Sequence, residues 1–438
     1  MSACCLDLPH SFFFVTLLLL TGFDDPFQRG LVALRQDHIQ EAIDAFTAAA
    51  SAHPNDARVH NFLGLAFMAA DRTKDAAAEY LRATELNGQF EDAYRNLGYL
   101  EWSSHEHARA RSHLERALQL APGDKFALYY LGRVEMDDHD AASAVRSFER
   151  LGDSFDLALA YLYAGRYQDS VKTAKNLPDS ADASTVLGVA EAKLGDESGA
   201  AAALRKAAEA DGGHEERWLN LSRELMGSSH YPEALAAVEQ GLRSNPRSYA
   251  LQLRLGAVHL ASGDYAAAEK AFRELVDASD PLPTSAAGLA QVLLRTGRAE
   301  EAVTLLSSTE RRLGPQFLIV YFEGLALDRS GDRKSALVAF RRAVDMNPEN
   351  PEAHFGVGRI ELVLGQPREA AGELETVLRL QPRNVAAQRL LRLAKARAKE
   401  DSNKDVTLPS DIEADREPPS FVGDFLLPDW HPPRSESR

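Results

Sequence analysis

The sequence predicts an all-α fold in which antiparallel helix pairs stack into a solenoid. One alanine recurs every 34 residues from Ala200 to Ala370, and again from Ala42 to Ala144. A small residue also stands at the eighth position of each full 34-residue unit. Within each unit, apolar residues recur at three- and four-residue spacing in two runs of about a dozen, which is typical of paired amphipathic helices.

The two small residues of each unit have a physical reason. Where two helices cross closely, only Gly, Ala or Ser lets the backbones approach, while larger residues at positions seven, eleven and twenty-four fill the space beside them. A glycine at position fifteen suits a left-handed helix end, and a late proline stops the second helix. Each unit is therefore predicted to be a helical hairpin. The eighth positions are Gly30, Gly64, Gly98, Gly132, Gly188, Ser222, Gly256, Ala290, Gly324 and Gly358.

This spacing resembles the tetratricopeptide repeat, whose 34-residue pattern runs large apolar, Leu-Gly, aromatic, Ala, Phe, Ala, Pro. Eleven units in register cover Phe23–Asn384. The resemblance implies a right-handed superhelical solenoid that binds proteins along its concave face. The residues of Glu91–Asp124 that carry it are Tyr94, Leu97, Gly98, Ala110, Leu114, Ala117 and Pro122, and those of Glu215–Ser248 are Trp218, Leu221, Ala234 and Pro246.

Taken in order, the units have predicted bounds with one irregularity. Phe23–Asp56 is a first unit that departs from the repeat pattern, as expected at an end of the array that faces solvent. A shortened unit lies at about 155–180, with helices at Phe155–Tyr163 and near Tyr167–Asn176. We expect a change in curvature there, although natural length variation explains it equally well. The regular units are Ala57–Phe90, Glu91–Asp124, Lys125–Ser154, Ala181–His214, Glu215–Ser248, Tyr249–Leu282, Pro283–Gln316 and the pair within Phe317–Asn384, and Val385–Glu400 is predicted to be a capping helix.

The N-terminal segment, residues 1–22, holds the apolar run Phe12–Leu20. The run is too short to span a bilayer but long enough for a secretory signal. No Lys or Arg precedes the run, and Leu20, Thr21 and Gly22 match the small-residue pattern of a cleavage site only in part. A mis-assigned start, or an apolar strip on the first repeat, are the alternatives. The protein is expected to be exported or periplasmic if this segment is a signal peptide, and cytoplasmic otherwise.

The C-terminal tail, residues 401–438, carries nine acids against four bases and is predicted to be disordered. Residues 418–433 form an apolar island within it. Such islands often order on binding, to a partner or to the protein's own groove, and packing on the capping helix is the alternative. The candidate docking residues are Phe421, Phe425, Leu426, Leu427 and Trp430.

Composition and motifs argue against catalysis. The net charge of −16 disfavours nucleic acid, which needs a basic surface. Both cysteines, Cys4 and Cys5, precede the repeats, and the common phosphate-loop, hydrolase and zinc motifs are absent. His105 and His107 with residues 137–140 could hint at a metal, but turns are ordinarily polar. We therefore predict a non-enzymatic protein without cofactor or metal.

The resemblance implies that positions two, five, nine and twelve of each first helix point to the concave face. Here they are rich in aromatic residues and Arg, which are over-represented in binding hot spots, and in Met, which adapts to varied side chains. Alternatively, Tyr129 or Tyr321 packs between neighbouring first helices. The candidate partner-binding residues are Arg95, Tyr99, Trp102, Tyr129, Arg133, Met136, Arg223, Tyr321, Phe355 and Arg359.

Two functions follow as hypotheses. The first is a scaffold that binds an extended peptide or helix of a partner protein, with Tyr99, Trp102 and Tyr129 as apolar anchors and Arg95 and Arg133 pairing with acidic groups of the ligand. The second is an accessory subunit of an envelope assembly or secretion system, of polysaccharide-export or pilus type. The asparagine ladder of sugar-transferring relatives is not reproduced, because position six varies among Asn, Phe, Tyr, Val and Arg.

Overall fold

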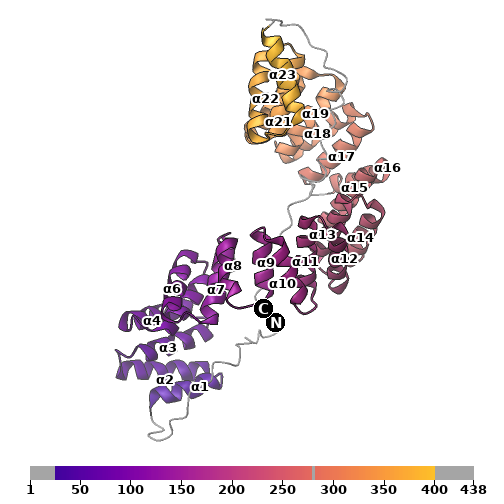
Figure 1. Cartoon of the computed structure of the whole chain (residues 1–438). Coiled ribbons are helices and arrows are strands. Elements are labelled where there is room, and N and C mark those ends of the chain that lie inside the picture. Colours follow the sequence, from indigo (N-terminus) through magenta and orange to yellow (C-terminus); the bar gives the residue numbers. More distant parts are fainter. Residues whose placement is uncertain (1–24, 279–281, 400–438) are drawn as a thin grey trace. The chain divides into compact units, whose positions relative to one another are not determined.

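The computed structural model describes residues 25–278 and 282–399, and in this part of the chain all regular elements are α-helices (Figure 1). The N-terminal apolar segment and the C-terminal tail with its island lie outside the described residues. The helices are α1 Pro26–Arg35, α2 Ile39–Ala52, α3 Ala57–Ala69, α4 Thr73–Leu86, α5 Glu91–Ser103, α6 His107–Leu120, α7 Lys125–Asp137, α8 Ala141–Glu149, α9 Phe155–Tyr163, α10 Tyr167–Asn176, α11 Ala181–Leu194, α12 Glu197–Ala210, α13 Glu215–Gly227, α14 Tyr231–Ser244, α15 Tyr249–Ser262, α16 Tyr265–Val276, α17 Pro283–Arg295, α18 Ala299–Leu313, α19 Phe317–Ser330, α20 Arg333–Met346, α21 Pro351–Val363, α22 Pro367–Leu380 and α23 Val385–Lys399.

The helices pair as hairpins, from α1 and α2 to α21 and α22, and α23 packs on the last pair (Figure 1). This confirms the all-helical solenoid. The short hairpin has the helices Phe155–Tyr163 and Tyr167–Asn176, the same bounds that the sequence pattern indicates. We call the odd-numbered helices from α1 to α21 the first helices, and the surface that they line the first-helix face.

Close crossings explain the small eighth position. A Cβ atom on Gly132 would lie 2.5 Å from the ring of Phe148, which is fully buried at position twenty-four of the same hairpin. Phe272 of α16 lies against two glycines, Gly256 of the same hairpin and Gly288 of α17, the next first helix. A Cβ atom on these glycines would lie 2.7 and 2.6 Å from the Phe272 ring. One large side chain therefore joins a hairpin to the first helix that follows it.

The turn inside each hairpin is left-handed at position fifteen. Glycine holds this place at Gly165, Gly195, Gly263, Gly297, Gly331 and Gly365, whereas Asp37, Asp71, His105, His139 and Ser229 adopt φ between 57° and 61°. The next residue donates its N–H five residues back, as Asp140 does to the carbonyl oxygen of Glu135 at 2.8 Å. This bond satisfies a carbonyl that the helix end leaves open.

The chain divides into two compact units. Unit 1 comprises the described residues up to Ala203, and unit 2 comprises those from Leu204 onward, so the border lies within α12. The short hairpin α9–α10 therefore lies inside unit 1. The change in curvature that we expect at this hairpin stays a prediction. Among the described helices, none is both long and apolar enough to cross a membrane.

Candidate functional site

Five aromatic side chains gather on the first-helix face of unit 1, where α5 and α7 contact each other. We call Tyr99, Trp102, Phe126, Tyr129 and Tyr130 the aromatic cluster. Its centre is Tyr130, whose ring centroid lies 4.5 Å from Phe126, 4.7 Å from Tyr99, 4.9 Å from Trp102 and 5.1 Å from Tyr129. All five side chains are half-buried, so each still presents part of its ring.

Tyr130 was missed by sequence reasoning because it occupies position six rather than an inward position. The signal that could have found it is the spacing of α7, where Phe126 and Tyr130 are four residues apart and so share a helix face. Burial raises the pKa of Tyr130 to about 12.

Polar contacts hold Trp102 in place from two sides. Its indole Nε1 donates a hydrogen bond to Oδ2 of Asp137 at 2.9 Å. The guanidinium of Arg133 lies 5.4 Å from the Trp102 ring and donates to the Tyr129 hydroxyl at 3.2 Å. Both contacts limit the rotamers that Trp102 can adopt.

Arg95 does not offer its charge in the way that the sequence suggests. Its guanidinium lies 2.5 Å from a carboxylate oxygen of Asp92 and 3.1 Å from one of Asp124, and its centre is 5.7 Å from the Phe126 ring. Asp124 also caps α7 by accepting the N–H groups of Phe126 and Ala127. Arg95 therefore links α5 to the N-terminus of α7, and its charge is paired with two carboxylates of the protein.

Tyr129 and Met136 lie at the edge of this surface. Both are half-buried and pack against the core beneath α8 and α9, and the rings of Tyr129 and Phe148 are 6.2 Å apart. Tyr129 therefore serves packing as well as the exposed cluster, and the packing alternative holds for it in part.

In unit 2 the candidate residues separate into exposed and interior ones. Arg223 and Phe355 are half-buried, whereas Tyr321 and Arg359 are each 3% exposed. The ring of Tyr321 lies 5.8 Å from that of Phe340, and Arg359 donates to the buried carboxylate of Asp328 at 2.5 Å. Tyr321 and Arg359 therefore stabilise the stack, and we leave them out of the proposed binding surface. The candidates Phe421, Phe425, Leu426, Leu427 and Trp430 lie outside the described residues.

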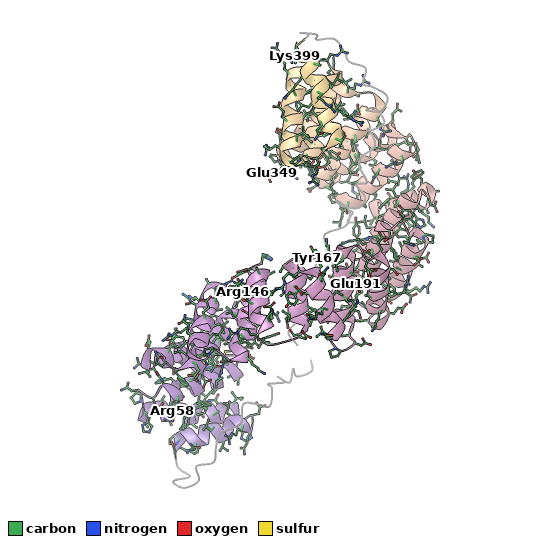
Figure 2. The ribbon with its side chains drawn as sticks, in the orientation of Figure 1. Arg58, Arg146, Tyr167, Glu191, Glu349 and Lys399 are labelled. Carbon is green, nitrogen blue, oxygen red and sulfur yellow. The ribbon has the colours of Figure 1, made fainter. Side chains whose placement is uncertain are left out.

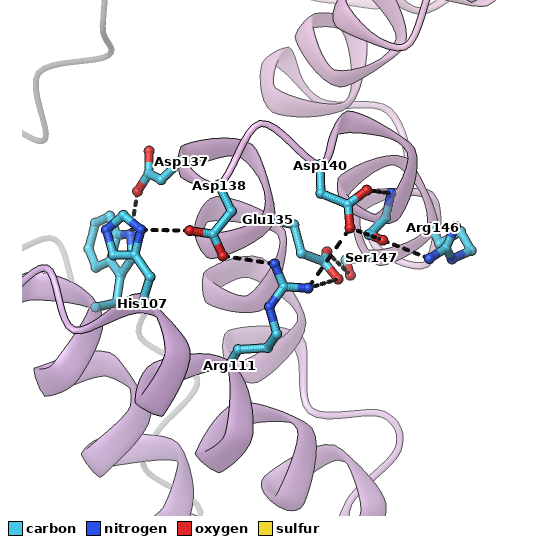
Figure 3. Close-up of polar contacts among 10 residues, drawn as sticks. His107, Arg111, Glu135, Asp137, Asp138, Asp140, Arg146 and Ser147 are labelled. Atoms are coloured by element: carbon cyan, nitrogen blue, oxygen red, sulfur yellow. Dashed lines mark hydrogen bonds and ion pairs between the residues drawn. The ribbon is translucent and has the colours of Figure 1, made fainter.

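Two of the turn residues that hint at a metal, Asp138 and Asp140, lie beside the guanidinium of Arg111 instead (Figure 3). Arg111 lies 2.9 Å from Asp138, 3.9 Å from Glu135 and 4.0 Å from Asp140, and His107 is 2.9 Å from Asp138. The hydrogen bond that Asp138 accepts from Arg111 lowers the pKa of the Asp138 carboxyl. Within residues 25–278 and 282–399, no group of three or more His, Cys, Asp or Glu could hold a metal ion.

A second feature missed by sequence reasoning is Arg254 of α15, which is 1% exposed. Among the described residues, its Nε and Nη1 atoms have no hydrogen-bond partner. Burial, together with the nearby guanidinium of Arg223, lowers the pKa of Arg254 to about 9. The signal in the sequence is its place at position six, where Asn96 and Asn220 stand in other units.

Comparisons with known proteins agree with this architecture. One tetratricopeptide repeat family model matches residues 27–90, 95–153, 155–215, 219–286 and 263–316, and another matches residues 329–395. Cellulose synthase operon protein C of Pseudomonas fluorescens (strain SBW25) is 28% identical over 203 residues, 44% of this chain. The chain spans only 16% of the length of that relative.

One solved structure resembles the chain at the level of fold, and a second is a weaker match. The crystal structure of yeast Tom70 has a TM-score of 0.50 and 13% identity, and the match covers 86% of this chain and 95% of that one. The APC/C hetero-tetramer Cut9-Hcn1 matches with a TM-score of 0.40 and 13% identity over 86% of this chain and 96% of that chain.

Proposed function

Because the chain belongs to the tetratricopeptide repeat family, we propose that it is a protein-interaction scaffold that binds a segment of a partner protein on the first-helix face of unit 1. The observation that carries this proposal is the aromatic cluster, whose half-buried rings contact one another at edge-to-face and tilted angles on two adjacent first helices. Aromatic side chains supply a large contact area with few rotatable bonds, and they dominate binding hot spots. The proposal includes no catalytic step.

The charges around the cluster indicate the chemistry of the bound segment. Arg95 is paired with Asp92 and Asp124, and Asp137 holds the indole of Trp102. The surface therefore offers ring faces and one guanidinium, that of Arg133, rather than two cations for an acidic ligand. An extended peptide or helix that presents apolar or aromatic side chains fits this surface best.

The proposal is tested by crosslinking at the cluster in the native organism. Tyr99 is replaced by a photoreactive phenylalanine derivative that keeps a ring at this position, and the same group is placed at Val338 of α20, which is 60% exposed, as the control. We expect a crosslinked protein at position 99 that is absent at position 338. Equal products at both positions would contradict specific binding at the cluster.

Affinity then measures the role of single side chains. With the crosslinked partner purified, we expect Trp102→Ala plus Arg133→Ala to weaken binding by about 30-fold or more, the loss typical of a hot spot. Val338→Ala is the matched control and should leave affinity unchanged. The helicity of the double variant, measured by circular dichroism, should equal that of the wild type. Unchanged affinity in the double variant would move the binding surface elsewhere.

A second candidate function is an accessory subunit of an envelope assembly or secretion system. It is supported by the match to a cellulose synthase operon protein, although this covers 16% of that relative. N-terminal sequencing of the protein from fractionated cells tests it. A chain that begins near Gly22 in the periplasmic fraction supports this function, and an intact Met1 in the cytoplasmic fraction counts against it.

A further inference from the structure

Arg254 is an exception among the buried arginines of unit 2. Arg217 and Arg359 are also less than 9% exposed, but each pairs with a carboxylate, at 3.1 Å to Asp211 and 2.5 Å to Asp328. Among the described residues, Arg254 has no such partner for Nε or Nη1, and the charged group that affects it is Arg223, another cation. The buried guanidinium thus lacks an anion.

Such an arrangement is unfavourable unless something compensates it. A buried charge without a partner loses its hydration and gains no ion pair, so proteins retain one where a ligand or a further segment supplies the counter-charge. The planar guanidinium, with its fork of N–H donors, is matched to a carboxylate. Arg223 on the neighbouring first helix α13 adds a second positive charge beside it.

The tail of this chain has the matching chemistry. Its island, residues 418–433, contains Asp424 and Asp429 and has no Lys or Arg. The same island carries apolar residues that suit the half-buried apolar side chains Leu219 and Met226 of α13. The island therefore combines the counter-charge with an apolar surface.

The tail is also long enough to reach this place. Lys399 ends α23 on the side away from Glu349, which precedes α21 (Figure 2). From Lys399 to Asp424 the chain can extend over at most about 85 Å, at about 3.4 Å per residue. The path from α23 back to α15 passes neighbouring helices spaced about 8–10 Å apart, which amounts to at most about 80 Å.

We propose that the guanidinium of Arg254, with Arg223 nearby, marks a carboxylate-binding site on the first-helix face of unit 2, and that the acidic, apolar island of the chain's own tail, residues 418–433, occupies it. The tail then acts as an internal ligand that a partner with a similar acidic segment would have to displace. This inference does not depend on the aromatic cluster of unit 1.

Hydrogen exchange of the full chain tests the proposal. Amides of residues 418–433 should exchange more slowly in the wild type than in Arg254→Met or in Asp424→Asn plus Asp429→Asn, by about tenfold at low salt. The protection should shrink as salt is raised, since salt screens ion pairs. Arg243→Met is the matched control, because Arg243 is an exposed arginine of α14 in the same unit.

Two results would overturn the proposal. One is fast exchange of residues 418–433 in the wild type, which would leave Arg254 for the carboxylate of another protein. The other is equal protection in the wild type, in Arg254→Met and in the tail variant. The tail variant keeps the test valid if Arg254→Met fails to fold, because it changes no residue of the repeats.

Discussion

Position four of several units makes the same hydrogen bond with different side chains. It donates to the carbonyl oxygen six residues earlier, at the end of the preceding hairpin, over 2.9 to 3.1 Å. Because the donor side chain is His, Trp or Gln in different units, no single residue type in the sequence marks this hydrogen bond. The pairs are His60 with Pro54, Trp218 with Gly212, Gln252 with Pro246, His354 with Pro348 and Gln388 with Pro382.

His354→Leu should destabilise the last hairpin. His354 is 7% exposed, and its second ring nitrogen lies 2.6 Å from Glu373, so the substitution leaves two polar partners unpaired. We expect a loss of about 1–3 kcal/mol in the opening free energy of α21 and α22, measured by native-state hydrogen exchange. Gln388→Leu is the control, because its bond to Pro382 is exposed and should be worth less. Equal losses in the two variants would show that burial does not determine how much this hydrogen bond contributes to stability.

Position eleven shows a related device, which is a buried glutamate. Glu135 is 6% exposed and accepts a hydrogen bond from Ser147 of the second helix at 2.7 Å. Burial, opposed by the Ser147 bond and by Arg111, raises the pKa of Glu135. The folded protein therefore binds a proton at Glu135 more readily than the unfolded chain does, and this group favours folding less as pH rises through its folded pKa.

Glu135→Gln should for this reason raise the melting temperature at pH 7. Glutamine keeps an acceptor for Ser147 but removes the buried charge. The gain should vanish as pH falls toward the range in which the glutamate is protonated in the folded and the unfolded state. Thermal unfolding at pH 7 and pH 4 measures both arms. A gain that stays constant with pH would mean that charge burial is not its cause.

At the scale of the helix pair, the contact between positions eight and twenty-four fixes the crossing. Gly132→Ala should lower stability by about 1–3 kcal/mol, because the added methyl group would lie 2.5 Å from Cε1 of Phe148. In the background of Phe148→Leu the same change should cost less, since leucine lacks the two ring atoms that make the closest contacts. Urea unfolding of the four variants gives the coupling energy. An additive result would place the strain elsewhere.

This contact also explains why the helices could be predicted from the sequence. A residue that would clash at 2.5 to 3.0 Å leaves a strong periodic signal, as at Gly98, Gly132 and Gly358. The sequence therefore predicts the helix Phe155–Tyr163 and a helix that begins at Val385, and the structure confirms both. The partners of the buried glutamates could not be predicted, because they are His113 for Glu101 but Ser147 for Glu135, and no fixed letter marks them.

Across the whole molecule, equal repeat positions do not have equal exposure. Tyr129 and Tyr321 both stand at position five, yet Tyr129 is half-buried and Tyr321 is 3% exposed. Arg133 and Arg359 share position nine, and only Arg359 is closed off, because Asp328 of the preceding first helix pairs with it. The candidate site was therefore predicted only in part, since exposure depends on how neighbouring units fill the face and not on the repeat itself.

Since the helix contacts recorded among residues 25–278 and 282–399 join hairpins that are neighbours along the chain, damage should remain local. In Gly132→Ala, amides of α5 to α10 should exchange faster, while those of α19 to α23 should keep their wild-type protection. Gly358→Ala is the mirrored control, because its added methyl group would lie 3.0 Å from Leu374, and it should affect α19 to α23 alone. Native-state hydrogen exchange on both variants separates this behaviour from that of a globular domain. If either substitution lowered protection equally in all helices, the array would unfold as one cooperative unit, and the aromatic cluster and Arg254 would share a single stability.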